Sequence, residues 1–366
     1  MLDFLKLRPE AFGLDFSDLS LKIVKLEKQR DDLSLASFGE TIINPGIIKD
    51  GEIRNKDLLV QSIKKALTEV KGKKIKTKYV VASLPEEKAF LEVIKMPKMA
   101  EEDLKSAVFY EAENYIPLPI DQVYLDSQIV YPLANHLDHY DVLINAFPKK
   151  IVDAYTLCLE EAGLKPTVLE IESAAAARAL IKDELATSPV LIIDFGASKT
   201  TFIIYSGRAL RYTFSISDSS LKFTEIIARE LKIDFAKADA LKMEYGLEMN
   251  GNKEAATVFQ ILLAYLSDFV EQIKKHTDYY SSHIDQDHLP PGGREIKKIL
   301  LCGEGANLKG LTNFLERRLG IPVEYGNPWI NVFPGGKKKI PKLLFEKSLK
   351  YTTVLGLALR GVKNYD

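Results

Sequence analysis

Two segments far apart in the sequence repeat one pattern, an apolar strand that ends in Asp-Phe and is followed by two more strands. The first copy runs from Phe12 to Ile43 and reads FGLDF, SLKIVKLE and LSLASFGETII. The second copy starts at Ser188 and reads SPVLIIDFGASKTTFIIYSGRALRYTFSIS. Alternating apolar residues between turn signals predict strands, and the shared order indicates a weak internal duplication. We therefore expect two related β-sheet domains that face each other across a cleft, with Asp15 and Asp194 pointing into it from opposite sides.

The composition is that of an ordinary soluble, globular protein. Of the 366 residues 46% are hydrophobic, and 50 basic side chains balance 51 acidic ones, for a formal net charge of −1. The length predicts two or three domains. The near-neutral charge argues against nucleic acid as a partner, because nonspecific phosphate binding needs clustered positive charge. The longest uncharged run, Ala255 to Ser267, is too short to span a bilayer. Two cysteines and no export signal predict a cytoplasmic location.

The segments between and after the two copies divide the rest of the chain. From Phe90 to Lys165, a strand, an acidic helix, the break PLP, two strands and a second helix predict a small α+β insert. From Leu221 to Ser281 the pattern is helical, with an apolar stripe typical of a packed helix. The chain then returns as a strand, a glycine loop, a helix and a strand in KKILLCGEGANLKGLTNFLERRLGIPVEY, and it closes with the helix LKYTTVLGLALRG.

The two Asp-Phe strand ends carry the residues best suited to bind phosphate. An aspartate there can hold a hydrated Mg²⁺, while backbone N–H groups of the following small residues, Gly196 to Ser198, bind phosphate oxygens. One such copy alone is also typical of an ordinary β-hairpin with an N-terminal Asp turn. Two copies that face each other, together with the glycine loop CGEGA further along the chain, favour a nucleotide clamp.

This order of segments resembles the actin-like ATPase superfamily, an α/β fold of duplicated, ribonuclease H-like domains. The closer resemblance is to the PilM family of type IV pilus assembly proteins, which is related to the division protein FtsA. The segments FGLDFSDLSLKIVKLEK and LIIDFGASKTTFII resemble its two phosphate segments, LEIESAAAARAL and VLGLALRG its two connecting helices, and CGEGANLKGL its adenosine segment. The most specific matches are MPKMAEEDLKSAVFYEAENYIPLPIDQVYLD, which resembles the FtsA and PilM type of insert, and NPW at Asn327 to Trp329.

The resemblance implies a division of the chain into five parts. They are a first core subdomain at 9–86 and 164–189, an inserted α+β subdomain of the 1C type at 87–163, a second core subdomain at 190–225 and 296–347, a helical subdomain of the 2B type at 226–295, and a closing helix at the interdomain cleft at 348–362.

The resemblance also implies an ATP site with Mg²⁺ in the cleft. Asp15 and Asp194 would hold the metal through water, and Glu172 would stand where relatives keep a water-orienting catalytic residue. Gly303 and Gly305 would flank the nucleoside. The full set of implied nucleotide contacts is Asp15, Ser17, Ser20, Lys22, Asp194, Gly196, Ala197, Ser198, Lys199, Thr200, Gly303, Glu304, Gly305 and Asn307.

Several positions depart from the pattern of these relatives. Ser17 and Asp18 stand where the first phosphate loop usually has a glycine and a hydroxyl, and Glu304 stands where the adenosine loop commonly has another glycine. A second carboxylate beside a triphosphate weakens binding by like-charge repulsion. We therefore expect weakened ATP binding and at most weak ATPase activity.

The implied function is that of a cytoplasmic, ATP-binding scaffold in the inner-membrane assembly complex of the type IV pilus. Its implied partner is the cytoplasmic N-terminal peptide of a PilN-like membrane protein, with other inner-membrane platform proteins beside it. The peptide would lie in a groove between the first core subdomain and the insert, and it would tether the protein to the inner membrane. The candidate peptide contacts are Leu104, Val108 and Tyr115, which recur at near-helical spacing. Two alternatives stay open: an FtsA-like division or membrane-tether protein, and an actin-superfamily ATPase or kinase that uses Glu172.

Overall fold

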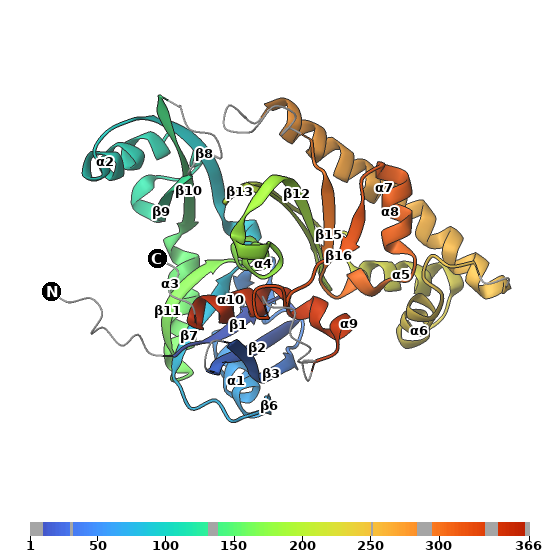
Figure 1. Cartoon of the computed structure of the whole chain (residues 1–366). Coiled ribbons are helices and arrows are strands. Elements are labelled where there is room, and N and C mark those ends of the chain that lie inside the picture. Colours follow the sequence, from blue (N-terminus) through green and yellow to red (C-terminus); the bar gives the residue numbers. More distant parts are fainter. Residues whose placement is uncertain are drawn as a thin grey trace.

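Two large β-sheets form the two halves of the molecule and share one strand order, apart from an additional edge strand in the first sheet (Figure 1). The computed structural model describes residues 10–29, 32–130, 138–249, 252–283, 295–333 and 343–362. One sheet has the order β11-β7-β1-β2-β3-β6, and the other has the order β16-β15-β12-β13-β14. In each, the Asp-Phe strand pairs antiparallel with the strand that follows it and parallel with a strand from later in the chain. The matching orders confirm the predicted duplication.

The strands of the first sheet are β1 (Phe12–Phe16), β2 (Ser20–Gln29), β3 (Asp32–Ile42), β6 (Lys71–Gly72), β7 (Tyr79–Leu84) and β11 (Lys165–Ile171). The strands of the second sheet are β12 (Ala186–Phe195), β13 (Thr200–Gly207), β14 (Ala209–Ile216), β15 (Lys298–Cys302) and β16 (Val323–Tyr325). Between β3 and β6 lie the small hairpin of β4 (Ile48–Lys49) and β5 (Glu52–Ile53) and the helix α1 (Lys56–Thr68), which Asn55 caps by accepting a hydrogen bond from the Leu58 N–H.

Two helices cross between the sheets. The helix α4 (Glu172–Leu180) follows the last strand of the first sheet and contacts β13 and β14 of the second. The helix α10 (Thr352–Val362) follows the second sheet in the chain and packs on β1, β2 and β7 of the first. The two helices also pack on each other in the centre of the molecule (Figure 1). Each domain therefore contributes a helix to the core of the other.

The insert is a separate layer attached to the first sheet. Its strands β8 (Phe90–Pro97), β10 (His139–Pro148) and β9 (Val123–Val130) form an antiparallel sheet with β10 in the middle, which leaves β9 at an edge. The helix α2 (Glu101–Ala112) packs on this sheet, and β8 also contacts β14 of the second domain. The buried ion pair of Asp141 and Arg211, 3.3 Å apart, joins the insert to the second domain.

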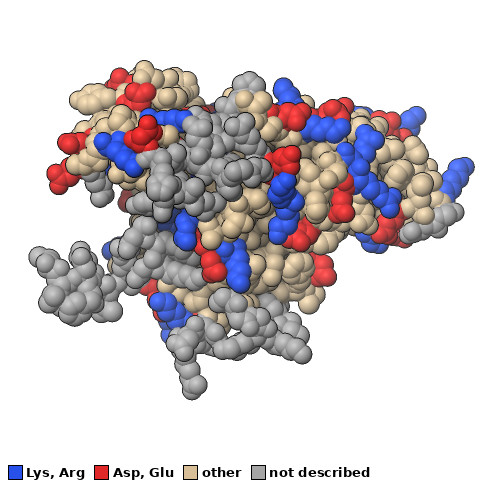
Figure 2. All heavy atoms as spheres, turned by 45° about the horizontal axis from the view of Figure 1, so that its top comes forward, with Lys and Arg blue, Asp and Glu red and all other residues tan. Residues whose placement is uncertain are grey.

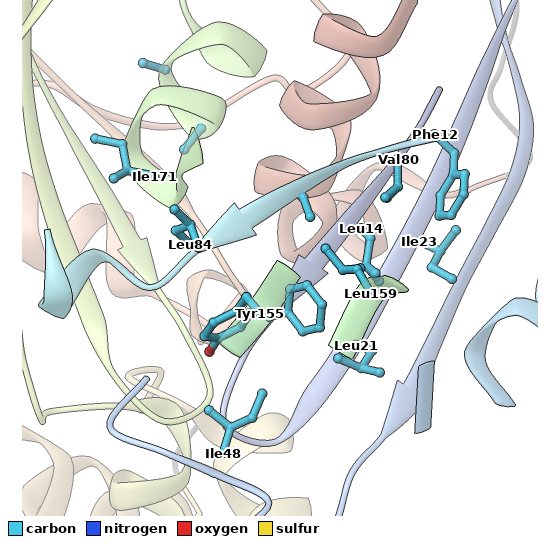
Figure 3. Close-up of a cluster of buried hydrophobic side chains, with 14 of the residues drawn as sticks. Phe12, Leu14, Leu21, Ile23, Ile48, Val80, Leu84, Tyr155, Leu159 and Ile171 are labelled. Atoms are coloured by element: carbon cyan, nitrogen blue, oxygen red, sulfur yellow. The ribbon is translucent and has the colours of Figure 1, made fainter. Parts of the chain in front are cut away.

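The remaining helices complete the two domains. In the first, α3 (Lys149–Glu161) falls within the predicted insert range but packs against α1 and β11, where Tyr155 and Leu159 belong to the core of this sheet (Figure 3). The second domain carries α5 (Ser220–Leu231), α6 (Phe235–Tyr245), α7 (Lys253–His283), α8 (Leu311–Leu319) and α9 (Phe345–Ser348). The helices α5, α6 and α7 pack together as the predicted helical part. The exact domain ranges stay a prediction.

Two large apolar clusters form most of the core, and the first also includes residues of the second sheet such as Ile192, Ile203 and Leu300. In the first, side chains from β1, β2, β7 and the helix α3 converge, as the labelled residues of Figure 3 show. In the second, the apolar stripe of α7 packs on the sheet through residues that include Leu266, Phe269 and Ile273. On the face in Figure 2, acidic and basic side chains are interspersed over the described residues. Within the described part of the chain, no helix is both long and apolar enough to cross a membrane.

Candidate functional site

The ends of β1 and β12 meet at a cavity of about 60 Å³ between the two sheets. Asp15 is the second-last residue of β1 and pairs with Lys22 of β2. Asp194 is the second-last residue of β12 and pairs with Thr201 of β13. All four side chains line the cavity. The duplication therefore places two equivalent carboxylates in one site, as expected from the sequence.

The rest of the wall comes from loops and helix ends. The predicted residues that line the cavity are Asp15, Ser17, Lys22, Glu172, Asp194, Gly196, Ala197, Ser198, Lys199, Gly303 and Glu304. Gly303 has a φ of +88°, and a Cβ there would lie 2.4 Å from Oδ1 of Asp194. This close approach of the chain to the carboxylate requires glycine.

Four predicted contact residues do not line the cavity. Ser20 accepts a hydrogen bond from Lys22 through its Oγ, 3.0 Å away, and the Thr200 hydroxyl donates to the Asp218 carbonyl at 2.6 Å. Gly305 packs against the ring of Phe195. Asn307 donates a hydrogen bond from Nδ2 to the Glu346 carbonyl at 3.0 Å. These residues support the wall from behind. The lining residues that the sequence analysis missed are Thr201, Leu349, Lys350, Thr352 and Thr353.

The missed residues have one recognisable signal in the sequence. Four of them lie in the run LKYTT, where paired hydroxyls directly precede the apolar part of the closing helix. In the structure Thr353 donates from Oγ1 to Oδ2 of Asp194 at 3.5 Å. The start of α10 therefore belongs to the site as well as to the core.

The two aspartates share a buried, negatively charged environment. Burial raises the pKa of Asp15, although the nearby Lys22 opposes that shift. Burial, and then the charge of Asp15, raise the pKa of Asp194 to about 6. Oδ1 of Asp15 is buried and has no hydrogen-bond partner among the described residues. The site thus carries more negative charge than its own cations neutralise.

Lys199 spans the cavity from the second domain to the first. Its ammonium donates to Oε2 of Glu172 at 2.7 Å and forms a second, shorter ion pair with Glu87. Burial alone would lower the pKa of Lys199, but the charges of Glu172 and Glu87 outweigh it and raise the value. Burial also raises the pKa of Glu172 to about 8, against the effect of Lys199. With more carboxylates than cations in contact, the lysine keeps its charge and one carboxyl retains a proton near neutral pH.

Asp18 does not lie where the sequence analysis placed it. It does not line the cavity. Its carboxylate instead accepts hydrogen bonds from the backbone N–H groups of Asp50, at 2.9 Å, and Gly51, at 3.2 Å. Both residues have positive φ, which turns the two N–H groups toward it. The expected repulsion between Asp18 and phosphate therefore has no support in the structure, whereas Ser17 and Glu304 do line the cavity.

The donor set of this cavity fits a hydrated divalent cation that carries phosphate. Mg²⁺ usually binds through one or two carboxylates and several waters, and Asp15 and Asp194 supply such a pair from opposite sides. A cation in the cavity would provide a partner for the unpaired Oδ1 of Asp15, and its charge would lower the raised pKa values of Asp15 and Asp194. The volume of about 60 Å³ is far below the roughly 300–1,000 Å³ of a small-molecule site. A nucleotide therefore requires the cleft to open from this conformation.

A second, larger hollow of about 280 Å³ lies between the first domain and the insert. One side is formed by residues 124–128 of β9, one of the two edge strands of the insert sheet. The other side is formed by residues 169–171 of β11, an edge strand of the six-stranded sheet, and by Ala174 and Arg178 of α4. We call this hollow the groove. It lies where the sequence analysis expected a peptide, between the first core subdomain and the insert.

The floor of the groove contains a buried ion network. The Arg178 guanidinium binds both carboxylate oxygens of Glu170, at 2.5 and 3.0 Å, and donates to the Gly356 carbonyl at 3.3 Å. Arg360 of α10 forms a further ion pair with Glu170. Such a bidentate pair has a defined geometry and resists rearrangement. It holds β11, α4 and α10 together beneath the groove.

The three peptide contacts predicted from the sequence, Leu104, Val108 and Tyr115, lie outside the groove. Leu104 is 4% and Val108 1% exposed, because both pack into the core between α2 and the insert sheet. Tyr115 is 48% exposed but lines a different hollow, beside Glu92 and Thr213. None of the three lines the groove. Helical spacing correctly indicated an apolar face, but that face is covered by the insert itself.

Comparison with known proteins identifies the family. A model of the family described as type IV pilus assembly protein PilM matches residues 13–362. The chain belongs to the PilM family. Of the cell division proteins, FtsA of Enterococcus hirae is 25% identical over 353 residues, covering 85% of this chain and 77% of that protein. This relationship agrees with the link to FtsA that the sequence indicated.

Solved structures show the same architecture. A structure described as a PilM–PilN type IV pilus biogenesis complex is 28% identical, covers 97% of this chain and 99% of that chain, and has a TM-score of 0.79. MreB5 of Spiroplasma citri bound to ADP is 13% identical, covers 95% of each chain and has a TM-score of 0.54, which supports the actin-like fold alone. The fold is therefore actin-like, as predicted. The PilM family match and the PilM–PilN neighbour favour the pilus-assembly interpretation over the FtsA-like alternative.

Proposed function

We propose that the chain is an actin-like scaffold of type IV pilus assembly that binds the cytoplasmic N-terminal peptide of a PilN-like membrane protein in the groove. The observation that carries this proposal is the position of two sheet edges, β9 and β11, on opposite sides of one hollow. The neighbour described as a PilM–PilN complex supports the choice of partner. Capture of such a tail would hold this protein at the cytoplasmic face of the inner membrane.

The groove suits an extended peptide. An edge strand offers unpaired backbone N–H and C=O groups, so a peptide can add to it as a further strand and seat alternate side chains in pockets. The apolar walls for such side chains include Leu91 and Leu143 of the insert and Leu169 of the first sheet. Asn145 also lines the groove, and its Oδ1 is buried with no hydrogen-bond partner among the described residues, so it can accept a hydrogen bond from the peptide.

We further propose that the cavity binds ATP with Mg²⁺ as a ligand of the scaffold. Asp15 and Asp194 would hold the metal through water. The metal would in turn neutralise the charge of the phosphates. The loop from Gly196 to Lys199 lines the same cavity and would contact the phosphates. Actin-like neighbours described with ADP and AMPPNP support nucleotide as the ligand class. Glu172 would contribute at most weak hydrolysis, because its carboxylate is held by Lys199.

The test is calorimetry with a synthetic peptide that copies the N-terminal tail of the PilN-like protein from the same organism. Ser127 is an exposed residue of β9 that lines the groove, so Ser127→Trp fills it without touching the core. We expect this variant to bind the peptide at least about tenfold more weakly. Ser106→Trp, on the exposed face of α2, is the matched control and should bind like the wild type. Unchanged affinity in Ser127→Trp would place the peptide elsewhere.

A further inference from the structure

The sequence KGKKIKTK at residues 71–78 forms β6 and the loop that leads from it to β7. Figure 1 shows this loop running along the lower edge of the first domain. All of its lysines are exposed, and among the described residues only one of them has an acidic partner: Lys73, which pairs with Glu27 at 2.6 Å. The loop therefore carries a local excess of positive charge on a protein whose formal net charge is −1.

The loop is fixed to the first sheet at several points. The Ser37 hydroxyl donates a hydrogen bond to the carbonyl of Lys73, and the Thr77 hydroxyl donates to the carbonyl of Glu10 at 2.7 Å. Between these two points, Ile75 packs against the apolar core. Every second residue is thus turned toward the protein, and the lysines that alternate with them, Lys74, Lys76 and Lys78, are presented to solvent on the outer side of the loop.

The carboxylates next to this loop do not neutralise these three lysines. Glu10 and Glu27 both contact the ammonium of Lys25, at 3.1 and 3.7 Å, and the side chain of Lys25 is only 10% exposed. A nearly buried cation needs such partners, because it has lost most of its hydration. These two carboxylates are therefore used to compensate Lys25 and Lys73, which leaves the outer lysines free to meet an anion.

A further lysine connects this surface with the groove. Lys165 is exposed, its N–H donates to the carbonyl of Lys78 at 2.8 Å, and it begins the edge strand β11. Leu169, four residues further along β11, lines the groove, so about 13 Å of strand separates the two positions. We call the following residues the lysine patch: Lys71, Lys74, Lys76, Lys78 and Lys165. The lysine patch and the groove thus lie at the two ends of one edge strand.

We propose that the lysine patch binds the anionic headgroups of a phospholipid bilayer, as a second membrane contact beside the captured peptide. The inference rests on the proposed function, because the tail of a membrane-anchored partner in the groove is what brings this surface close to lipid. Each lysine near an acidic membrane surface strengthens binding by about fivefold. The loop has no aromatic residue on which the bases of a single-stranded nucleic acid could stack, which favours lipid over nucleic acid.

The lipid contact would also orient the protein. A flexible tail fixes the distance of a bound protein from the membrane but leaves its rotation free. A lysine patch beside the groove adds a second point of attachment, and two linked contacts bind more tightly than either one alone. The face that carries β6, the loop and the start of β11 would then turn toward the bilayer.

The test is co-sedimentation of the full chain with vesicles. We expect binding to vesicles of equal parts phosphatidylglycerol and phosphatidylcholine, a decrease in this binding with added salt, and no binding to phosphatidylcholine alone. The combined variant Lys74→Gln, Lys76→Gln and Lys78→Gln should bind the acidic vesicles at least about tenfold more weakly. The matched control loses the same charge from exposed lysines of α6 and α7 and should bind like the wild type; it combines Lys237→Gln, Lys253→Gln and Lys275→Gln.

The outcomes separate the lipid contact from the function on which it rests. The variant of the lysine patch should still bind the soluble tail peptide like the wild type in calorimetry. If the wild type fails to bind that peptide, the proposed function is wrong, whereas acidic vesicles bound through the lysine patch would still support the lipid contact. Equal binding to acidic and neutral vesicles, or an unchanged affinity in the variant, would overturn the inference. Binding to a single-stranded oligonucleotide without binding to acidic vesicles would overturn it in favour of nucleic acid.

Discussion

The close contact of α4 and α10 yields a prediction whose sign depends on two opposing effects. In Gly356→Ala, the new Cβ would lie 1.8 Å from the Ala175 carbonyl oxygen and 2.5 Å from its carbon. Ordinary contact begins at 3.4 Å, so the helices must separate by about 1.6 Å at this point. The obstacle is helix backbone, which cannot rotate away. Overpacking in a core costs about 1–3 kcal/mol, whereas alanine in a helix gains about 1 kcal/mol over glycine. Because an overlap of this size with helix backbone belongs at the upper end of the overpacking range, we expect the clash to prevail by about 2 kcal/mol.

The protein's single tryptophan makes this change measurable. Trp329 is buried in the cluster that includes Val354 and Leu355 of α10, so its fluorescence in a urea titration reports the packing of that helix. Gly361→Ala, on the same helix, is the graded comparison, because its Cβ would lie 2.8 Å from the nearest carbonyl oxygen and needs only about 0.6 Å of relief. We expect a clear fall in the urea midpoint for Gly356→Ala and a smaller one for Gly361→Ala. A Gly356→Ala protein as stable as the wild type would refute the reasoning.

Three further predictions follow from the site and the insert. Burial raises the pKa of Asp194 to about 6 and of Glu172 to about 8, whereas the same carboxyl groups lose their protons near pH 4 in the unfolded chain. Protons bound only by the folded chain stabilise it, so the stability that these two groups contribute is complete below about pH 4 and is lost as the pH rises to 8. The urea midpoint should fall over this range, and Glu172→Gln should flatten the upper part of the slope. Arg211→Met removes a cation from the buried Asp141 and should cost about 3–5 kcal/mol in urea unfolding, while Arg211→Met with Asp141→Leu should recover part of the loss. Asp18→Ser should lower the free energy of unfolding by about 1 kcal/mol and leave the calorimetric affinity for Mg²⁺–ATP unchanged. Tighter ATP binding by this variant would show that Asp18 repels the phosphates, as the sequence suggested.

Local patterns were sufficient for the elements and for the duplication. Alternating apolar residues mark strands, and the two Asp-Phe strand ends mark equivalent positions, so the meeting of Asp15 and Asp194 followed from the sequence once the sheets were taken to face each other. The helix and the strands of the insert could also be predicted from the sequence, because apolar residues recur with a helical period in one segment and alternate in the others. These features depend on residues within a few positions of one another.

Only the tertiary structure decided which partner each polar or apolar group meets. Lys199 binds Glu172, 27 residues away, and Glu87, 112 residues away, and no local pattern links them. Asp18 turns to a hairpin 32 residues further along the chain. Leu104 and Val108 lie on an apolar face that the insert sheet covers. Periodicity shows which face of an element avoids water, but what covers that face, and which charges meet across a cleft, depends on how separate elements pack together.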